Sequence, residues 1–398
     1  MRAAIGALLL LLIFGASLSH DRVAAAANES CQLRSTRTQL RLPAAVTITT
    51  SCGAFVIGRD GGVRRTSTDP SPVPQGTSWW PYTGVWDRLV GGHLIVGRWQ
   101  KQLWRSSGIF PVAYQVGVIT IGPHALVFSY GDRSPDLYLA PMRGSERLLA
   151  TGEYPVGWTR GGFYTRTVRG GAILLRSATG ERQETFARRV STYAYDEASG
   201  SFYLIANGVL VRADGRAQRP IASLSRLGFP RRGYLQIQPL GKLVALESAL
   251  RLVVLHSDGT LFASTRLPHG RARHDAISSQ LAASPSAQAV AFTATRGNTA
   301  YGSNGIETVY LLRPGDRAAR MIHRERVSFA ICERGASVAW HGRWLLYSAS
   351  EGNTALIDAV RPWHALELTR LVRRLPGLAS DEGNLDLTVS WTGQPTGV

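Results

Sequence analysis

A short sequence unit recurs along most of this chain, and this repeat constrains the fold more than any other feature. Its clearest copies are three strand-like segments that contain a tryptophan, Val156–Thr159, Val338–His341 and Val389–Thr392. Repeats of about 40 residues on strand-forming sequence are typical of radial or solenoid arrays, because each unit buries its apolar face against its neighbours. The equivalent positions are Ile119, Trp158, Tyr195, Ile237, Ala283, Trp340 and Trp391.

A turn between two apolar runs is the second mark of each unit. Three copies carry Asp-Gly, which supplies the positive φ angles that a tight hairpin needs. These turns centre on Gly61, Gly215 and Gly259, and looser copies centre on Gly144, Gly180 and Gly315. Four short strands fill about 40 residues, which is the size of one β-propeller blade.

The repeat therefore predicts an all-β fold, a β-propeller of four-stranded blades formed by residues 45–398 as a single domain. We expect seven blades, with six or eight as alternatives, because residues 40–117 have room for one or two units besides the clear ones. The strand near residues 45–50 should complete the last blade and close the ring. Residues 362–375 fit a short helix or the third strand of the last blade, and their place in the repeat favours the strand.

Two copies of the unit resemble the TolB-type propeller repeat, in which Ser-Pro-Asp-Gly lies between a tryptophan or apolar residue and an Ile-Ala-Phe strand. Ser284-Pro285 before Val290-Ala291-Phe292 is one copy, and the segment from Trp340 to Ser348 is a looser one. This TolB-like and WD-repeat-like resemblance implies the architecture and supplies no catalytic residues. No copy keeps the whole Ser-Pro-Asp-Gly turn, and the chain has no room for the N-terminal α/β domain of TolB.

The N-terminus has the pattern of a secretion signal. Arg2 precedes an apolar run at residues 3–18, and small residues at 24–27 offer a cleavage site before Asn28. The apolar run is shorter than the roughly 20 residues of a membrane-spanning helix, and no later stretch is apolar enough to span a bilayer. We expect a signal peptide at 1–27, an N-terminal segment at 28–44 and a mature protein that is secreted or held in the periplasm or cell envelope. An uncleaved anchor is the alternative.

Three cysteines fit an oxidising compartment. Cys31 and Cys52 flank a 20-residue segment and are expected to form a disulfide. Cys332 lies in an apolar stretch and is expected to be a buried thiol.

The chain is strongly basic, with a formal net charge of +18 at pH 7. Lys101 and Lys242 are the only lysines among its 45 basic residues, so arginine supplies the charge. This excess favours anionic partners such as cell-envelope polymers and glycans, whereas a solvated surface without a dedicated partner is the alternative. Nucleic acid is not an expected partner.

Sequence motifs for catalysis and for metal or nucleotide binding are absent, including G-x-S-x-G, H-E-x-x-H, C-x-x-C and the P-loop. We therefore expect no cofactor, and our leading hypothesis is a non-catalytic module that binds a protein or an anionic polymer. The alternative is a glycan-active enzyme with two carboxylates facing each other across the central channel. The candidates are Asp132, Asp136, Asp196, Glu197, Glu333 and Asp381.

The first candidate binding segment is aromatic. Trp79, Trp80 and Tyr82 follow a Pro-rich stretch that is expected to be an extended loop. Aromatic side chains exposed on a loop can stack on sugar rings or peptide prolines. The alternative is that these side chains pack over one end of the ring.

The second candidate binding segment is polar: His269, Arg271, Arg273, His274 and Asp275. We expect it in a loop at one end of the ring, where it would bind an anion or remain solvated. A metal site is not expected there, because three or four ligands must converge and adjacent residues of an extended chain point apart. Trp158, Trp340 and Trp391, by contrast, are expected to pack between blades.

Overall fold

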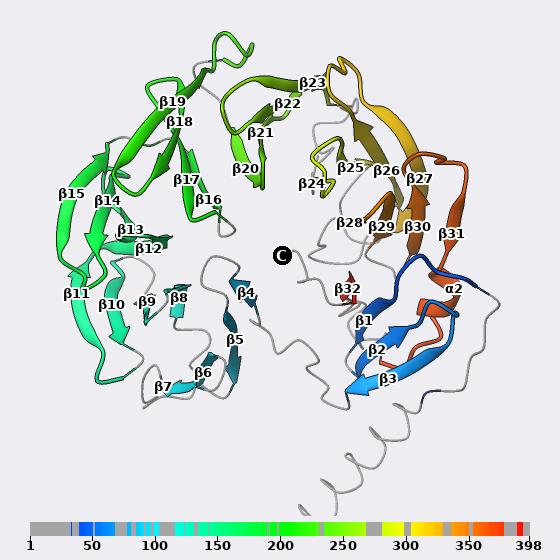
Figure 1. The fold of residues 1–398 in the computed structure, drawn as a ribbon, viewed down its shortest axis with the longest axis horizontal. Coiled ribbons are helices and arrows are strands. Elements are labelled where there is room, and N and C mark those ends of the chain that lie inside the picture. The colour runs from blue at the N-terminus through cyan, green and yellow to red at the C-terminus, as the bar shows by residue number, and fades with distance from the viewer. Residues whose placement is uncertain are drawn as a thin grey trace, which may run out of the picture.

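The structure, a computed structural model, describes residues 33, 40–50, 52–67, 78–80, 85–90, 93–96, 99–102, 116–122, 124–130, 134–141, 143–188, 190, 192–196, 199–230, 235–267, 281–297, 304–328, 336–349, 353–377 and 388–392. From 78 to 119 the description covers the backbone of these segments. Across these ranges the strands form eight four-stranded antiparallel sheets, arranged around a central axis (Figure 1). We call the sheets blades 1 to 8 in ring order.

The blades follow one another along the chain. Blade 1 comprises β4 (Ser78–Trp80), β5 (Val85–Val90), β6 (His93–Val96) and β7 (Trp99–Gln102); blade 2 comprises β8 (Val116–Ile121), β9 (Ala125–Tyr130), β10 (Asp136–Pro141) and β11 (Arg147–Thr151). Blade 3 comprises β12 (Glu153–Thr159), β13 (Gly162–Thr167), β14 (Ile173–Ser177) and β15 (Arg182–Ala187); blade 4 comprises β16 (Thr192–Asp196), β17 (Ser201–Ala206), β18 (Val209–Asp214) and β19 (Ala217–Ser223). Blade 5 comprises β20 (Gln236–Leu240), β21 (Leu243–Ser248), β22 (Arg251–His256) and β23 (Leu261–Arg266); blade 6 comprises β24 (Leu281–Ala283), β25 (Val290–Gly297), β26 (Asn304–Leu312) and β27 (Arg320–Ser328). Blade 7 comprises β28 (Ser337–His341), β29 (Trp344–Ser348), β30 (Thr354–Asp358) and β31 (Ala365–Glu367).

Blade 8 joins the two ends of the chain. Its inner strand is β32 (Thr388–Trp391), and its other three strands are β1 (Val46–Thr50), β2 (Gly53–Ile57) and β3 (Val63–Ser67). β1 pairs antiparallel with β32, with Val46 opposite Trp391 and Thr49 opposite Thr388. The expected closure of the ring by the N-terminal strand is therefore confirmed.

The predicted all-β propeller of four-stranded blades is confirmed. The sequence favoured seven blades and also allowed eight; blades 2 to 8 are described with side chains, and blade 1 adds an eighth sheet through its backbone. Blade 1 is hard to recognise in the sequence because its four strands and their connections all lie within residues 78–102. It therefore occupies far fewer residues than the roughly 40 of a typical unit.

The predicted hairpin turns all take the same place in the blade. Each joins the third strand to the fourth, counted outward from the axis. The backbone φ is 61° at Gly215 and 95° at Gly259, values that the Asp-Gly sequence permits because glycine has no Cβ.

Aromatic side chains on the inner strands of blades 3, 4, 7 and 8 tie each of these blades to the one before it. Trp158, Trp340 and Trp391 are buried, as expected for residues that pack between blades. Their indole groups donate to backbone carbonyls of the preceding inner strand: Trp158 Nε1 to Thr120 O (3.3 Å), Trp340 Nε1 to Ala282 O (2.9 Å) and Trp391 Nε1 to Ala339 O (3.1 Å). The Tyr195 hydroxyl donates in the same way to the carbonyl of Trp158.

Glycine makes room for two of these rings. A Cβ placed on Gly122 would lie 2.4 Å from the Trp158 indole, and one on Gly157 would lie 2.5 Å from the Tyr195 ring. Both distances are too short for any side chain, so the inner strands need glycine at these two contacts.

Residues 362–375 contain both of the structures that the sequence allowed. Residues 365–367 form β31, the fourth strand of blade 7 rather than the favoured third, and helix α2 (Thr369–Val372) follows. The helix forms because apolar side chains recur three and four residues apart and fill the space beside blade 8. These are Leu368, Leu371, Val372 and Leu375, which cluster with Val46, Ile48, Phe55 and Trp391.

Candidate functional site

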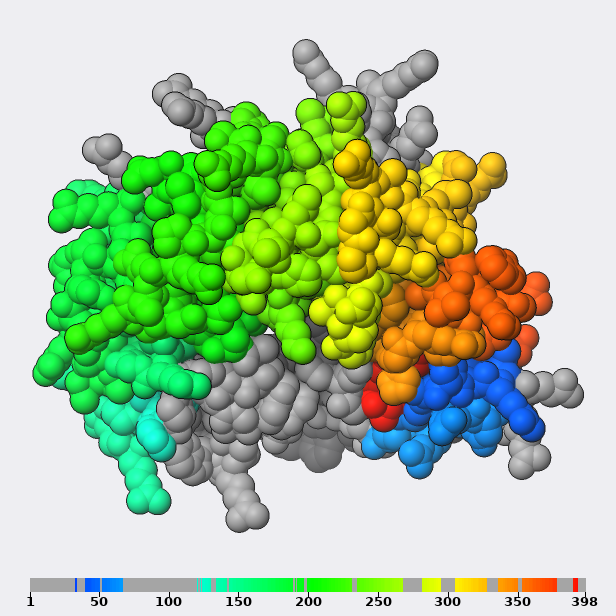
Figure 2. Space-filling view, turned by 45° about the horizontal axis from the view of Figure 1, so that its top comes forward, coloured from blue at the N-terminus to red at the C-terminus, as the bar shows by residue number. Residues whose placement is uncertain are grey.

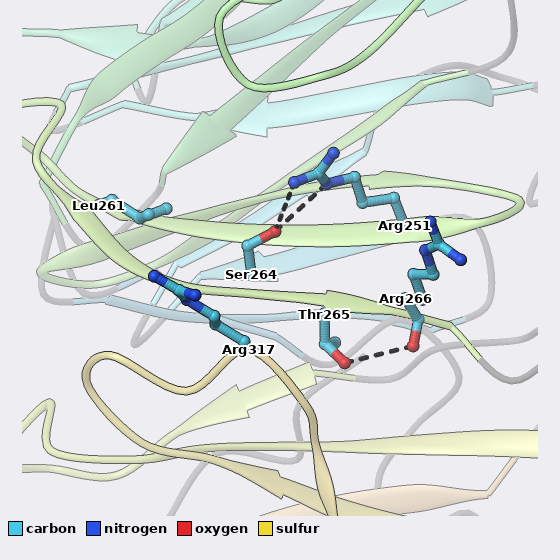
Figure 3. Close-up of a pocket in the computed structure, with 6 residues that line it drawn as sticks. All are labelled: Arg251, Leu261, Ser264, Thr265, Arg266 and Arg317. Carbon is cyan, nitrogen blue, oxygen red and sulfur yellow. Dashed lines mark hydrogen bonds between the residues drawn. The ribbon is translucent and has the colours of Figure 1, made fainter.

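An arginine-lined pocket lies on the outer rim of blade 5. It has a volume of about 370 Å³ and is lined by Arg251, Leu261, Ser264, Thr265, Arg266 and Arg317 (Figure 3). β22 supplies Arg251, β23 supplies the next four residues, and the turn between β26 and β27 supplies Arg317. The pocket is therefore built from two neighbouring blades.

The strand pairing places two arginines side by side. Arg251 lies directly opposite Arg266 in the β22–β23 ladder, and Val253 lies opposite Ser264. Opposite residues share a face of the sheet, with Cβ atoms about 5 Å apart, so Arg251, Ser264 and Arg266 all project from one face. Two like charges in this position repel each other unless an anion lies between them.

Arg251 is held by a hydroxyl group rather than by a carboxylate. Its Nε and Nη2 donate to Ser264 Oγ at 3.2 and 3.1 Å. Gly228, in the connection from blade 4, packs against the same guanidinium, since a Cβ there would lie 2.2 Å from Arg251 Nη1. The head group is thus positioned, and no described carboxylate forms an ion pair with it.

Hydrogen bonds between the blades fix the turn that carries Arg317. Gly315 N donates to Phe262 O (2.7 Å), and Ser264 N donates to Asp316 O (3.1 Å). Ala319 N donates to Thr265 Oγ1 (3.1 Å). These bonds cover the open edge of β23, and Arg317 extends from the turn toward Leu261 (Figure 3).

The pocket carries positive charge that no described carboxylate neutralises through an ion pair. In the described ranges, the ion pairs lie elsewhere, and none involves Arg251, Arg266 or Arg317. Guanidinium groups bind carboxylates and phosphates through paired N–H donors. The arrangement therefore suits an anionic group that would bridge the arginines and remove their mutual repulsion.

A second polar cluster lies between blades 6 and 7, where it is enclosed. The Tyr347 hydroxyl donates to Glu307 Oε2 (2.8 Å), and His323 forms an ion pair with Glu325 (3.7 Å). Burial, together with the charge of Glu307, raises the pKa of Tyr347. Burial also raises the pKa of Glu367, which belongs to the same group of charges. Glu307 is only 1% exposed, so this cluster contributes to blade packing rather than to a surface site.

The polar segment His269, Arg271, Arg273, His274 and Asp275 lies outside the described residues. Its role in binding stays a prediction. Along the chain it begins three residues after Arg266, so the sequence connects it directly to the strand that forms the pocket.

The aromatic segment is described in part. Trp79 and Trp80 lie on β4, the inner strand of blade 1, rather than in the expected loop, because the Pro-rich stretch ends before Ser78. Trp79 is the penultimate residue of its strand, as Trp158 and Trp340 are of theirs. Tyr82 lies outside the described residues, and the proposed ligand contacts of all three aromatics stay predictions.

Cys52 is disulfide-bonded. Its partner is one of the two other cysteines, Cys31 and Cys332, both of which lie outside the described residues. The pairing of Cys31 with Cys52 therefore stays a prediction.

Two of the six candidate carboxylates lie in the described part of the chain. Asp136, in blade 2, accepts a hydrogen bond from Thr151 Oγ1 (2.7 Å), and Asp196, in blade 4, accepts one from Ser199 Oγ (2.5 Å). Each carboxylate is held by a hydroxyl group close to it in the chain. The two carboxylates lie in different blades, so they do not form a catalytic pair. Asp132, Glu197, Glu333 and Asp381 lie outside the described residues.

Sequence reasoning did not single out Arg251, Arg266 or Arg317. A signal for the first two was nevertheless present, because Arg251 is seven residues before Asp258 and Arg266 is seven residues after Gly259. A hairpin centred on Asp258-Gly259 pairs these positions. Arg317 has no such signal, because its place depends on packing between blades.

The described residues provide two further findings. No helix among them is long and apolar enough to cross a lipid bilayer. None of their His, Cys, Asp and Glu side chains form a group of three that could hold a metal ion.

Comparison with solved structures supports the fold. Apo AztD from Citrobacter koseri matches with 8% identity over 87% of this chain and 97% of that chain, with a TM-score of 0.51. BamB from Moraxella catarrhalis matches with 12% identity over 84% and 89%, with a TM-score of 0.40, and the Neurospora crassa Pan2 WD40 domain with 9% identity over 63% and 78%, with a TM-score of 0.35. At these identities the similarity shows the propeller fold alone, which confirms the TolB-like and WD-repeat-like resemblance at that level. No protein-family model and no curated protein matches the sequence.

Proposed function

We propose that this propeller, residues 45–398, is a non-catalytic binding module that engages an anionic partner through the arginine pocket of blade 5. The partner would be an acidic protein surface or an anionic cell-envelope polymer or glycan. The single observation that carries this proposal is the cross-strand pairing of Arg251 with Arg266 without a carboxylate in the described part of the chain.

Energetics support binding rather than a structural role for the pocket. A structural arginine is normally neutralised by a carboxylate, since an unpaired charge near another of the same sign costs free energy. Like charges directly opposite each other on neighbouring strands are destabilising by up to about 1 kcal/mol. An anion between Arg251 and Arg266 would convert that repulsion into attraction.

We propose further that the mature chain begins at Asn28 after removal of a signal peptide and acts in the periplasm, the cell envelope or the extracellular space. The disulfide at Cys52 supports an oxidising compartment, because such bonds persist outside the cytoplasm. The secretion pattern at residues 1–27 supports the same location.

The test is binding of residues 28–398 to an array of heparin, polygalacturonate, polyphosphate and polyglutamate, with dextran as the neutral reference. We expect the wild type to bind one or more of the anionic polymers and not dextran. The Arg251→Gln/Arg266→Gln variant should lose affinity at least about tenfold.

The matched control is Arg160→Gln/Arg169→Gln, which removes the same charge from two exposed arginines of blade 3. If both double variants lose affinity equally, attraction by net charge explains the binding and the pocket has no special role. If the wild type binds none of the four polymers, the proposal is wrong.

A further inference from the structure

Blade 6, which contributes Arg317 to the arginine pocket, has the longest strands of the described blades. β25, β26 and β27 have 8, 9 and 9 residues, whereas the other described strands have three to seven. Figure 2 shows blade 6, in yellow, adjoining the light green surface of blade 5. β27 is the outermost strand of this long blade, and it begins three residues after Arg317.

The pairing of β27 places its carboxylate and two of its arginines on opposite faces. His323 and Glu325 lie opposite Val309 and Glu307, on the face that packs against blade 7. Arg324 and Arg326 lie opposite Thr308 and Ile306, on the other face. The one carboxylate of the strand therefore turns inward, while Arg324 and Arg326 are exposed on the opposite face. Arg320 lies opposite Leu311, on the same face as Glu325, because an irregularity in the pairing follows it.

These arginines have no internal partner. Arg320, Arg324 and Arg326 are exposed, and within the described part of the chain their guanidinium groups make no hydrogen bond or ion pair. The same holds for Arg266 and Arg317. Among the described residues, exposed guanidinium groups without a partner thus follow the outermost strand of blade 6 from the pocket, with Arg320 on one face and Arg324 and Arg326 on the other.

We propose that the arginine pocket and the outer edge of β27 form one continuous track for a linear polyanion, rather than a site for a single small anion. The inference rests on the proposed function and names its substrate class. Arg324 and Arg326 alternate on one face of β27 and lie about 7 Å apart, and Arg320 lies about 13 Å before Arg324 on the other face. Chains with a charge on each short repeating unit, such as phosphate polymers and polyuronates, can place successive anions at that spacing.

The experiment is a chain-length series measured by fluorescence anisotropy with residues 28–398. The probes are labelled tripolyphosphate, long-chain polyphosphate, and short and long oligogalacturonates. The long chains should bind at least about tenfold more tightly than the short chains of the same chemistry. The tighter of the two long chains identifies phosphate or carboxylate as the preferred anion.

Two double variants separate the track from the pocket. Arg324→Gln/Arg326→Gln should weaken long-chain binding about tenfold and leave tripolyphosphate binding unchanged. It should also reduce the slope of log affinity against log salt by about 1.4, at about 0.7 for each lost contact with a single-stranded polyanion. Arg251→Gln/Arg266→Gln should weaken binding of short and long chains alike.

The outcomes are distinguishable. Equal affinity for short and long chains, or no effect of Arg324→Gln/Arg326→Gln, overturns the track and leaves the pocket intact. An equal loss in the Arg160→Gln/Arg169→Gln control overturns it too, because net charge would then suffice. Absence of binding by every chain overturns both the track and the proposed function.

Discussion

Arg176 in blade 3 and Arg251 in blade 5 show two uses of the same residue type. Arg176 is 6% exposed, and it donates from Nη2 to Glu153 Oε1 at 2.8 Å and from Nε to Glu153 Oε2 at 3.1 Å. Its Nη1 bonds the Gly180 carbonyl at 2.8 Å. Arg251, by contrast, bonds a serine hydroxyl among the described residues and lies opposite Arg266.

The two arginines differ in the charged group that lies next to each guanidinium. In blade 3 the protein supplies the carboxylate, and the pair belongs to the folded structure. In blade 5 the strand opposite Arg251 supplies a second arginine, and no described carboxylate pairs with either of them. Sequence composition alone does not separate the two cases, because both arginines lie on ordinary strands.

The largest effect should follow from breaking the buried pair. Glu153→Ala leaves Arg176 buried without its carboxylate and also removes the acceptor of Thr165 Oγ1. We expect a loss of about 3–5 kcal/mol in the free energy of unfolding. Urea denaturation measures it, and a loss under 1 kcal/mol would show that Arg176 is not held by this pair.

A pH-dependent effect should follow from Glu247 on β21 of blade 5. Burial raises the pKa of this carboxyl to about 7 from an ordinary value of 4.5. The folded state therefore binds the proton more tightly than the unfolded state, so the contribution to stability is full below about pH 4.5 and is lost as the pH rises to 7. The loss is up to about 3 kcal/mol.

Glu247→Gln tests this effect against the wild type. The variant should be more stable than the wild type at pH 8 and differ little from it at pH 4, as measured by urea denaturation at both values. A variant that is less stable at pH 8 would contradict the account, because it would mean that the charged carboxylate stabilises blade 5.

The double change Arg251→Gln/Arg266→Gln tests whether the arginines of blade 5, unlike Arg176, are dispensable for stability. The free energy of unfolding should stay the same or rise by up to about 1 kcal/mol, because a like-charge contact is removed. Polyanion affinity should fall at least about tenfold in the same protein. A large loss of stability would place these arginines with Arg176 as structural residues.

The smallest effect on stability should follow from a substitution on the inner strand of blade 7. Trp340→Phe removes the bond from Nε1 to the Ala282 carbonyl and should cost about 1 kcal/mol of stability without changing polyanion affinity. Trp344→Phe is the control, because Trp344 makes no such bond in the described part of the chain. Equal stability of the two variants would show that the hydrogen bond between blades contributes nothing.

Much of the fold could be predicted from the sequence, because local rules govern the repeat. The turns at Gly215 and Gly259 and the inner-strand tryptophans were recognisable from composition and spacing. Blade 1 was not, since its four strands lie within residues 78–102, far fewer than a typical unit, and α2 depends on packing against blade 8. The arginine pocket could be predicted only in part. A hairpin rule pairs Arg251 with Arg266, whereas the position of Arg317 depends on contact between two blades.

The most direct test of the central claim is arginine footprinting with phenylglyoxal and mass spectrometry, with and without long-chain polyphosphate. We predict that Arg176 stays unmodified in the folded protein, that Arg251, Arg266 and Arg317 react, and that polyphosphate protects these three. Arg160 and Arg169 should react equally in both conditions. Unchanged modification of the pocket arginines, or uniform protection of all exposed arginines, would contradict the account.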